Sequence, residues 1–327
     1  MTATLASHPS PKPHSIYEYA GLARPPHLAR LERATHKSGV VESLSIGVDD
    51  TDDGYVPGFL HLPPDIFTTN PPPPSAAAAD VSIKSSSDHQ QYYQQPATAQ
   101  PPHHHRTAAI LLSGAGGGVT GPSSIYLSLA CKLATLGRGI PTLRLDYRAA
   151  GRAEPCVADV RAGMAYLRDL YGLDRFVLVG WSFGAAVALA AAADDPHVVG
   201  CAAVAADGAG SAPPLPDLTA RLPPRPLLLL HGSRDHTVEV ERSRRLFDAY
   251  GAGHDRALEI FEGDNHTLSS NAERAEELLC EFVARCAGVR VDQRERENVV
   301  AAELVEDGER RALMERGGDL RPPERED

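Results

Sequence analysis

The chain has 327 residues, of which 42% are hydrophobic, and its mean hydropathy is −0.25. This length and composition predict an ordinary soluble globular protein with a sizeable core, built as one large domain or two small ones. The net charge of −11 at pH 7 argues against a nucleic-acid binder, because neutralising phosphates requires clustered lysines and arginines.

The five cysteines lie far apart in the sequence, and none pairs at the spacing of a zinc or redox site. They are expected to be buried thiols in a reducing compartment. No stretch reaches eighteen uninterrupted apolar residues, and the N-terminus lacks the pattern of a secretory signal. We therefore expect a cytoplasmic protein; an organelle transit peptide within residues 1–38, which are acid-poor and carry several basic residues, is the alternative.

In chain order, residues 1–38 are weakly periodic and predict a partly disordered N-terminal tail. Residues 40–48 and 54–62 alternate apolar and polar side chains, which predicts an antiparallel pair of strands. Residues 63–106 are of low complexity and too poor in aliphatic side chains to form a core, so they predict a disordered insertion. Low complexity also explains the adjacent histidines His103–His105 better than a metal site does.

From residue 107 onward, short apolar segments alternate with longer amphipathic ones. The strand-like segments are 108–113, 141–147, 175–180, 198–206, 226–232 and 257–263, and the helix-like segments are 125–136, 157–171, 183–193, 238–250 and 268–286. This alternation predicts a mostly parallel sheet with helices on both faces. In such sheets, chemistry takes place at the carboxyl ends of the strands. The proline-rich segment between residues 206 and 226 is too short for a cap domain.

The predicted globular domain thus comprises residues 39–62 and 107–287. Residues 288–327 are highly charged and predict a C-terminal tail with a solvated helix, to which the sequence assigns no chemistry.

The segment Gly180–Gly184 reads GWSFG and fits the pattern G-x-S-x-G. In this pattern a sharp turn between a strand and a helix lifts the serine hydroxyl clear of the backbone. A strand-like segment precedes the motif and a helix former follows it, as the turn requires. The flanking glycines allow the close crossing and the positive φ of the nucleophile. A packing contact between small residues is the competing explanation.

Over residues 40–287 the chain resembles the α/β-hydrolase superfamily. Four segments carry the resemblance in order: SGAGGGVTGP, LRLDYRAAG, GWSFG, and HGSRDHTV followed by EGDNHTL. The nearest branch is the capless esterases that are similar to dienelactone hydrolases or to peptidases. In dienelactone hydrolases the nucleophile is a cysteine, whereas here it is Ser182, so their substrate does not carry over. The resemblance implies an eight-stranded, mostly parallel sheet with helices on both faces and without a cap domain.

The chain order of the superfamily implies an acid and then a histidine after Ser182. Asp235 and His266 each follow a strand-like segment and therefore emerge at the same edge of the sheet. The imidazole would take the serine proton, and the carboxylate would fix the tautomer of the imidazole. Asp207, after the preceding strand, is the alternative acid; HGSRD matches the commoner arrangement and favours Asp235.

The remaining histidines of this half of the chain, His231, His236 and His254, are interpreted as surface or supporting imidazoles. For the oxyanion of the intermediate, the expected donors are the backbone N–H of Phe183 and that of Ala115 or Gly116. A phosphate cradle is the competing explanation of the glycine run, but the spacing matches neither phosphate-binding motif.

Trp181, Tyr147 and Arg148 are weaker candidates for contacts with the substrate. Arg148 and Arg152 could favour an anionic substrate, although an exposed ion pair explains either arginine more simply.

The sequence therefore predicts a serine hydrolase that cleaves a carboxylic ester or thioester of a small soluble molecule through an acyl-enzyme, with no metal or organic cofactor. A peptidase or acyltransferase with the same three residues and a catalytically silent binding protein on the same fold are the alternatives.

Overall fold

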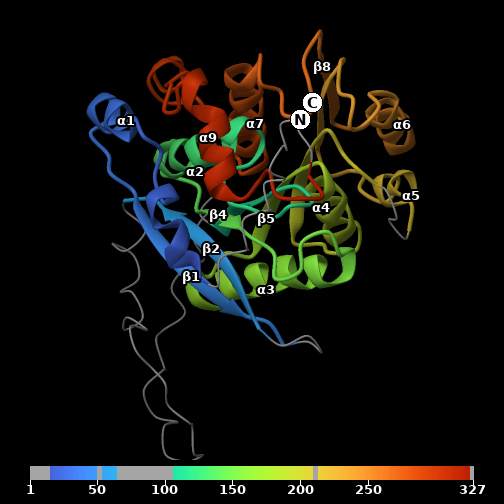
Figure 1. Ribbon diagram of the computed structural model, residues 1–327, viewed down its shortest axis with the longest axis horizontal. Coiled ribbons are helices and arrows are strands. Elements are labelled where there is room, and N and C mark those ends of the chain that lie inside the picture. Colours follow the sequence, from blue (N-terminus) through green and yellow to red (C-terminus); the bar gives the residue numbers. More distant parts are fainter. Residues whose placement is uncertain (1–14, 50–53, 65–105, 209–212, 325–327) are drawn as a thin grey trace, which may run out of the picture.

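The computed structural model describes residues 15–49, 54–64, 106–208 and 213–324, which form a sheet covered by helices on both faces (Figure 1). The sheet has eight strands in the order β1-β2-β4-β3-β5-β6-β7-β8. The strands are β1 (Val40–Gly47), β2 (Tyr55–Leu62), β3 (Thr107–Leu112), β4 (Thr142–Leu145), β5 (Arg175–Trp181), β6 (Val198–Val204), β7 (Leu227–Gly232) and β8 (Arg256–Phe261). Every predicted strand is present.

The sheet is parallel from β4 to β8, and β2 runs antiparallel to both β1 and β4. The central strands β3, β5 and β7 consist almost wholly of buried residues, as expected where helices cover both faces. Strand β8 lies at the edge of the sheet and alternates partly buried and exposed residues up to the buried Phe261. The predicted eight-stranded, mostly parallel sheet is confirmed.

Two layers of helices enclose the sheet. Helices α3 (Ala153–Tyr171), α4 (Phe183–Ala193), α5 (Leu215–Thr219) and α6 (Glu241–Tyr250) pack on one face. Helices α1 (Leu28–Thr35), α2 (Ile125–Thr135), α7 (Ala272–Cys286) and the π-helical turn η5 (Arg296–Val300) pack on the other. The remaining elements are the 3-10 turns η1 (Ile16–Leu22) and η4 (Pro122–Ser124) and the helices α8 (Gln293–Glu295) and α9 (Asp307–Gly317). None of the helices among the described residues combines the length and apolar composition needed to cross a bilayer.

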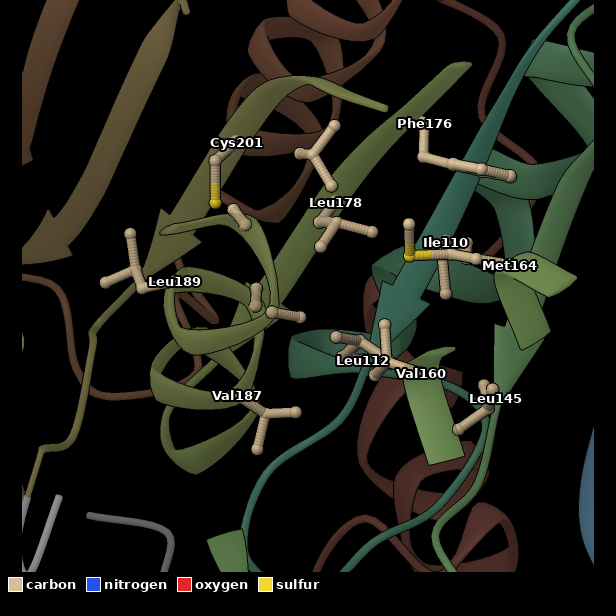
Figure 2. Packing of buried hydrophobic residues seen from close by; sticks show 14 of the residues in the cluster. Ile110, Leu112, Leu145, Val160, Met164, Phe176, Leu178, Val187, Leu189 and Cys201 are labelled. Carbon is tan, nitrogen blue, oxygen red and sulfur yellow. The ribbon is translucent and has the colours of Figure 1, made fainter. Parts of the chain in front are cut away.

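The alternation of side chains along each strand supplies both cores. On β5, Leu178 faces the α3 and α4 side, where it packs with Ile110 and Met164 (Figure 2). Its neighbours Val177 and Val179 face the α2 and α7 side.

The prediction of an N-terminal tail was wrong for residues 15–38. Ile16, Tyr19 and Leu22 on η1 are buried, as is Leu31 on α1. The three apolar residues of η1 recur every third position, which is the period of a 3-10 helix, so one side of this turn is apolar. Residues 1–14 lie outside the described residues, as do 65–105, which hold nearly all of the predicted insertion and His103–His105.

The expectation of a solvated C-terminal helix was also wrong. Val299, Val300, Leu304, Leu313 and Met314 are all buried. They are few among many charged residues, but they all face inward while most of the charged side chains face solvent. The segment after residue 287 is therefore part of the folded domain.

The central position of Leu178 predicts a large stability effect. Replacing Leu178 with alanine should lower the free energy of unfolding by about 2–5 kcal/mol, because the packed core cannot fill the cavity. The matched change Leu170→Ala, at an exposed position on α3, should cost less than about 0.5 kcal/mol. Urea denaturation followed by circular dichroism measures both, and equal losses would contradict the assigned core.

Candidate active site

Ser182 lies at the sharp turn between β5 and α4, with φ 54° and ψ −122°. Such a positive φ is strained for a residue with a side chain. The flanking glycines are required by close approach: a Cβ at Gly180 would lie 2.2 Å from the carbonyl oxygen of Gly184, and a Cβ at Gly184 would lie 2.2 Å from that of Ser113. The turn predicted from GWSFG is present.

Asp235 and His266 follow β7 and β8 and meet at the carboxyl edge of the sheet. His266 Nδ1 lies 2.7 Å from Asp235 Oδ2, and both side chains are wholly buried. The other carboxylate oxygen of Asp235 accepts the backbone N–H groups of Thr237 and Val238 at 2.9 and 2.7 Å. The alternative acid, Asp207, pairs instead with Arg242 at 2.8 Å.

His231 was predicted to be a surface or supporting imidazole. It is buried and contacts Asp235. Its Nε2 lies 2.9 Å from the carbonyl oxygen of Val238 and 3.1 Å from Asp235 Oδ2, and its Nδ1 lies 2.7 Å from Ser243 Oγ. Because a carbonyl oxygen only accepts, Nε2 carries the proton and Nδ1 accepts from the Ser243 hydroxyl. His231 therefore contacts the same carboxylate oxygen of Asp235 as His266 does. His236 and His254 are exposed.

The three weaker candidates for substrate contacts are engaged within the fold. Trp181 Nε1 donates to the carbonyl oxygen of His266 at 3.0 Å, and its ring lies 5.5 Å from the imidazole. The Tyr147 hydroxyl donates to the carbonyl oxygen of Ser113 at 3.1 Å. Arg148 forms an ion pair with Asp159. These partners fit a supporting role behind the site better than direct contact with a substrate.

Two of the expected oxyanion donors lie near Ser182: Phe183 follows it directly, and Ala115 contacts the same carboxylate as Ser182 does. Phe183 is the first residue of α4, where backbone N–H groups have no partner inside the helix and the helix dipole favours negative charge. Ala115 N–H donates to Glu324 Oε2. At Gly116 the backbone lies so close to Arg321 that a Cβ would be 2.4 Å from its carbonyl oxygen.

Glu324 is the residue that sequence analysis missed. Its Oε1 accepts from Ser182 Oγ at 3.1 Å and lies 3.2 Å from His266 Nε2, while its Oε2 accepts from Ala115. Its side chain is only 2% exposed. A single carboxylate from the C-terminal segment thus contacts the serine, the histidine and a backbone donor. As one acid among many in a charged segment, it carries no distinguishing sequence signal.

These contacts set the charge of the site. Burial alone would lower the pKa of His266, but the carboxylates of Asp235 and Glu324 outweigh it and raise the pKa to about 9. Burial alone would raise the pKa of Asp235, but hydrogen bonds from His231 and His266 hold it well below its usual range. Asp235 and Glu324 therefore both favour the charged form of His266 in this arrangement of the site.

Among the described residues, His27, Glu306 and Glu309 form a group with the composition of a metal site. His27 Nε2 lies 3.0 Å from Glu309 and 3.4 Å from Glu306, and Arg30 also pairs with Glu306. Contacts with Arg30 and His27 already engage these carboxylates, which explains the group as a link between the N-terminal and C-terminal segments.

A family model described as the alpha/beta hydrolase fold matches residues 89–251. The chain belongs to the α/β-hydrolase superfamily. A comparison with curated proteins finds no match.

Solved structures resemble the fold at low sequence identity. An esterase from Pyrococcus furiosus is 15% identical with a TM-score of 0.52, covering 78% of this chain and 93% of its own. A serine hydrolase without a lid from Xanthomonas campestris is 19% identical with a TM-score of 0.50, covering 75% and 94%. A puromycin-hydrolyzing peptidase from Mycobacterium tuberculosis is 18% identical with a TM-score of 0.53, covering 79% of this chain and 40% of its own. These likenesses establish the fold.

The raised pKa of His266 predicts how stability changes with pH. Protonated His266 stabilises the folded chain fully below its unfolded pKa of about 6.5, and this stabilisation is lost as pH rises through about 9. The free energy of unfolding should therefore fall by on the order of 1–3 kcal/mol across this range. The Glu324→Gln variant should show a smaller fall, because one of the two carboxylates that raise the pKa is removed.

Urea denaturation at several pH values measures the change, and NMR titration of His266 measures the pKa itself. The control is Glu315→Gln, a matched change at an exposed position on α9, which should retain the wild-type pH dependence. An unchanged His266 titration in Glu324→Gln would contradict the assigned contact.

Proposed function

We propose that this protein is a serine hydrolase that cleaves a carboxylic ester or thioester of a small molecule through an acyl-enzyme. One observation carries the proposal: the hydroxyl of Ser182, the imidazole of His266 and the N–H of Ala115 all contact a single carboxyl group. A carboxyl group occupies the space of an ester carbonyl. The nucleophile, the base and an oxyanion donor can therefore act on the same carbonyl.

The proposed reaction proceeds in two halves. Ser182 Oγ attacks the carbonyl carbon while His266 Nε2 takes the hydroxyl proton. The N–H groups of Phe183 and Ala115, or Gly116 in place of Ala115, hold the resulting oxyanion. His266 then returns the proton to the leaving alcohol or thiol. In the second half, His266 activates a water that releases the acid and restores Ser182.

Asp235 and His231 act through His266 in this proposal. Asp235 orients the imidazole through Nδ1 and stabilises the cation that forms when Nε2 accepts the proton. His231 and the backbone N–H groups of Thr237 and Val238 fix the carboxylate of Asp235, so that the charge is in place before the reaction begins.

The mechanism needs no metal or organic cofactor, because the side chains supply the nucleophile, the base and the oxyanion donors. Structural neighbours include an esterase and a puromycin-hydrolyzing peptidase. Peptide cleavage and acyl transfer to another nucleophile, which would use the same acyl-enzyme, are therefore the alternatives. We also infer a reducing, cytoplasmic location, because the five cysteines are buried free thiols.

Labelling with a fluorophosphonate tests the nucleophile. The probe should modify Ser182, and Ser182→Ala should abolish labelling and lower ester hydrolysis by about 10⁴-fold or more. The matched change Ser270→Ala, at an exposed turn, should leave both unchanged. Because Glu324 covers Ser182, each variant is also made together with Glu324→Gln. If the probe labels Ser182→Ala as strongly as the chain with Ser182, the proposal is contradicted. It is also contradicted if the probe labels neither the wild type nor Glu324→Gln, and a catalytically silent binding protein is then favoured.

The size of the substrate is tested with a series of p-nitrophenyl esters. A superfamily member without a cap domain lacks a large apolar cover, so turnover should be highest for short acyl chains and fall as the chain lengthens. Steady-state kcat/KM in the Glu324→Gln background measures the trend. A clear preference for long chains would contradict a small substrate.

A further inference from the structure

The chain beyond α9 returns to the active site along a fixed path. In Figure 1 the red segment that follows α9 runs toward the region of β5 and α4. Asp319 anchors its start: its carboxylate accepts from Ser113 Oγ at 2.6 Å, from Thr120 Oγ1 at 2.6 Å and from Gly121 N–H at 2.7 Å. Burial raises the pKa of Asp319 to about 6, although the hydrogen bonds from Ser113 and Thr120 oppose the shift. The anchor is thus a buried carboxylate with several donors.

A second group of contacts holds the segment near its end. The Arg321 guanidinium donates to the Tyr19 hydroxyl and lies over its ring, 5.6 Å from the centroid. The backbone N–H of Glu324 donates to the carbonyl oxygen of Arg321 at 2.9 Å, which closes a turn. This turn presents the side chain of Glu324 to Ser182.

The Glu324 carboxylate has the arrangement expected of a bound acid product. One of its oxygens contacts Ser182 and His266. In the proposed reaction this is the place where His266 activates the attacking water. The other oxygen contacts Ala115, where the oxyanion is held. Its negative charge matches the positive charge on His266. These groups bind a carboxylate through complementary charge and hydrogen bonds, without regard to the rest of the molecule that carries it.

We propose that the active site is a carboxylate-binding site and that the C-terminal segment is its internal ligand, which keeps the hydrolase closed until the segment is displaced. This proposal rests on the proposed function of the same site. The ligands of this site are carboxylic acids. The side chain of Glu324 is the ligand attached to the chain, and free carboxylic acids compete with it for the site. Only molecules in which the segment is displaced can bind a substrate. The apparent affinity for a substrate is therefore the intrinsic affinity multiplied by the fraction of such molecules.

Three variants release the segment by different means. Glu324→Gln removes the negative charge. Glu324→Asp keeps the charge on a side chain that is one methylene shorter. Deletion of residues 321–327 removes the contact with Ser182 and keeps Asp319. The rate of fluorophosphonate labelling and kcat/KM for p-nitrophenyl acetate should rise about tenfold to a hundredfold in Glu324→Gln and in the deletion. They should rise less in Glu324→Asp. The exposed control Glu315→Gln should match the wild type.

Adding the ligand back tests the site directly. A synthetic peptide of residues 318–327 should inhibit the deletion variant, and the same peptide carrying glutamine in place of Glu324 should inhibit it much less. Acetate should inhibit the deletion variant at lower concentration than it inhibits the full chain. Circular dichroism checks that each variant is folded; Glu324→Gln, which keeps every other contact of the segment, tests the proposal if the deletion does not fold.

The outcomes separate this inference from the proposed function. If the full chain and Glu324→Gln are labelled at the same rate and the label depends on Ser182, the internal ligand is overturned and the hydrolase stands. If neither is labelled nor hydrolyses any ester, the proposed function fails, and the inference that rests on it fails too. A peptide that inhibits equally with and without Glu324 would overturn the carboxylate site.

Discussion

The site depends on the position of the buried imidazole of His266 between the carboxyl groups of Asp235 and Glu324. A buried charge is costly unless partners compensate it, and here Asp235 and Glu324 each provide a hydrogen bond and an opposite charge. Asp235 is itself fixed by His231 and two backbone N–H groups, so it stays ionised within the fold. The pKa of His266 therefore depends on Glu324, a residue of the C-terminal segment, as well as on Asp235.

The sheet explains why residues so far apart in sequence meet. Parallel strands β5, β7 and β8 end at one edge, and Ser182, Asp235 and His266 each follow one of these strands. The strained φ of Ser182 is maintained because Gly180 and Gly184 let α4 approach the neighbouring strand more closely than any side chain would allow. Trp181 links the same turn to the backbone of His266, so Ser182 and His266 are held by one connected set of contacts.

The parts predicted from the sequence are those that the hydrophobic pattern encodes. Uninterrupted apolar runs marked the buried strands, and the order of GWSFG, HGSRD and EGDNH placed Ser182, Asp235 and His266 at one edge. The terminal segments were mispredicted because their anchors are sparse: three apolar residues of η1 and a few on η5 and α9 are outnumbered by charged and polar neighbours. Glu324 could not be singled out, since its importance comes from a contact across 142 positions with Ser182, which no local pattern records.

The contact between Arg321 and Tyr19 joins residues 302 positions apart. Bringing together the ends of so long a loop is entropically unfavourable until the intervening chain is compact. The sheet, the turn at Ser182 and the pair of Asp235 with His266 are all encoded before residue 287, whereas the covering segment needs both ends of the chain. We therefore expect the segment that carries Glu324 to take its place only after the intervening chain is compact, because Arg321 must meet Tyr19.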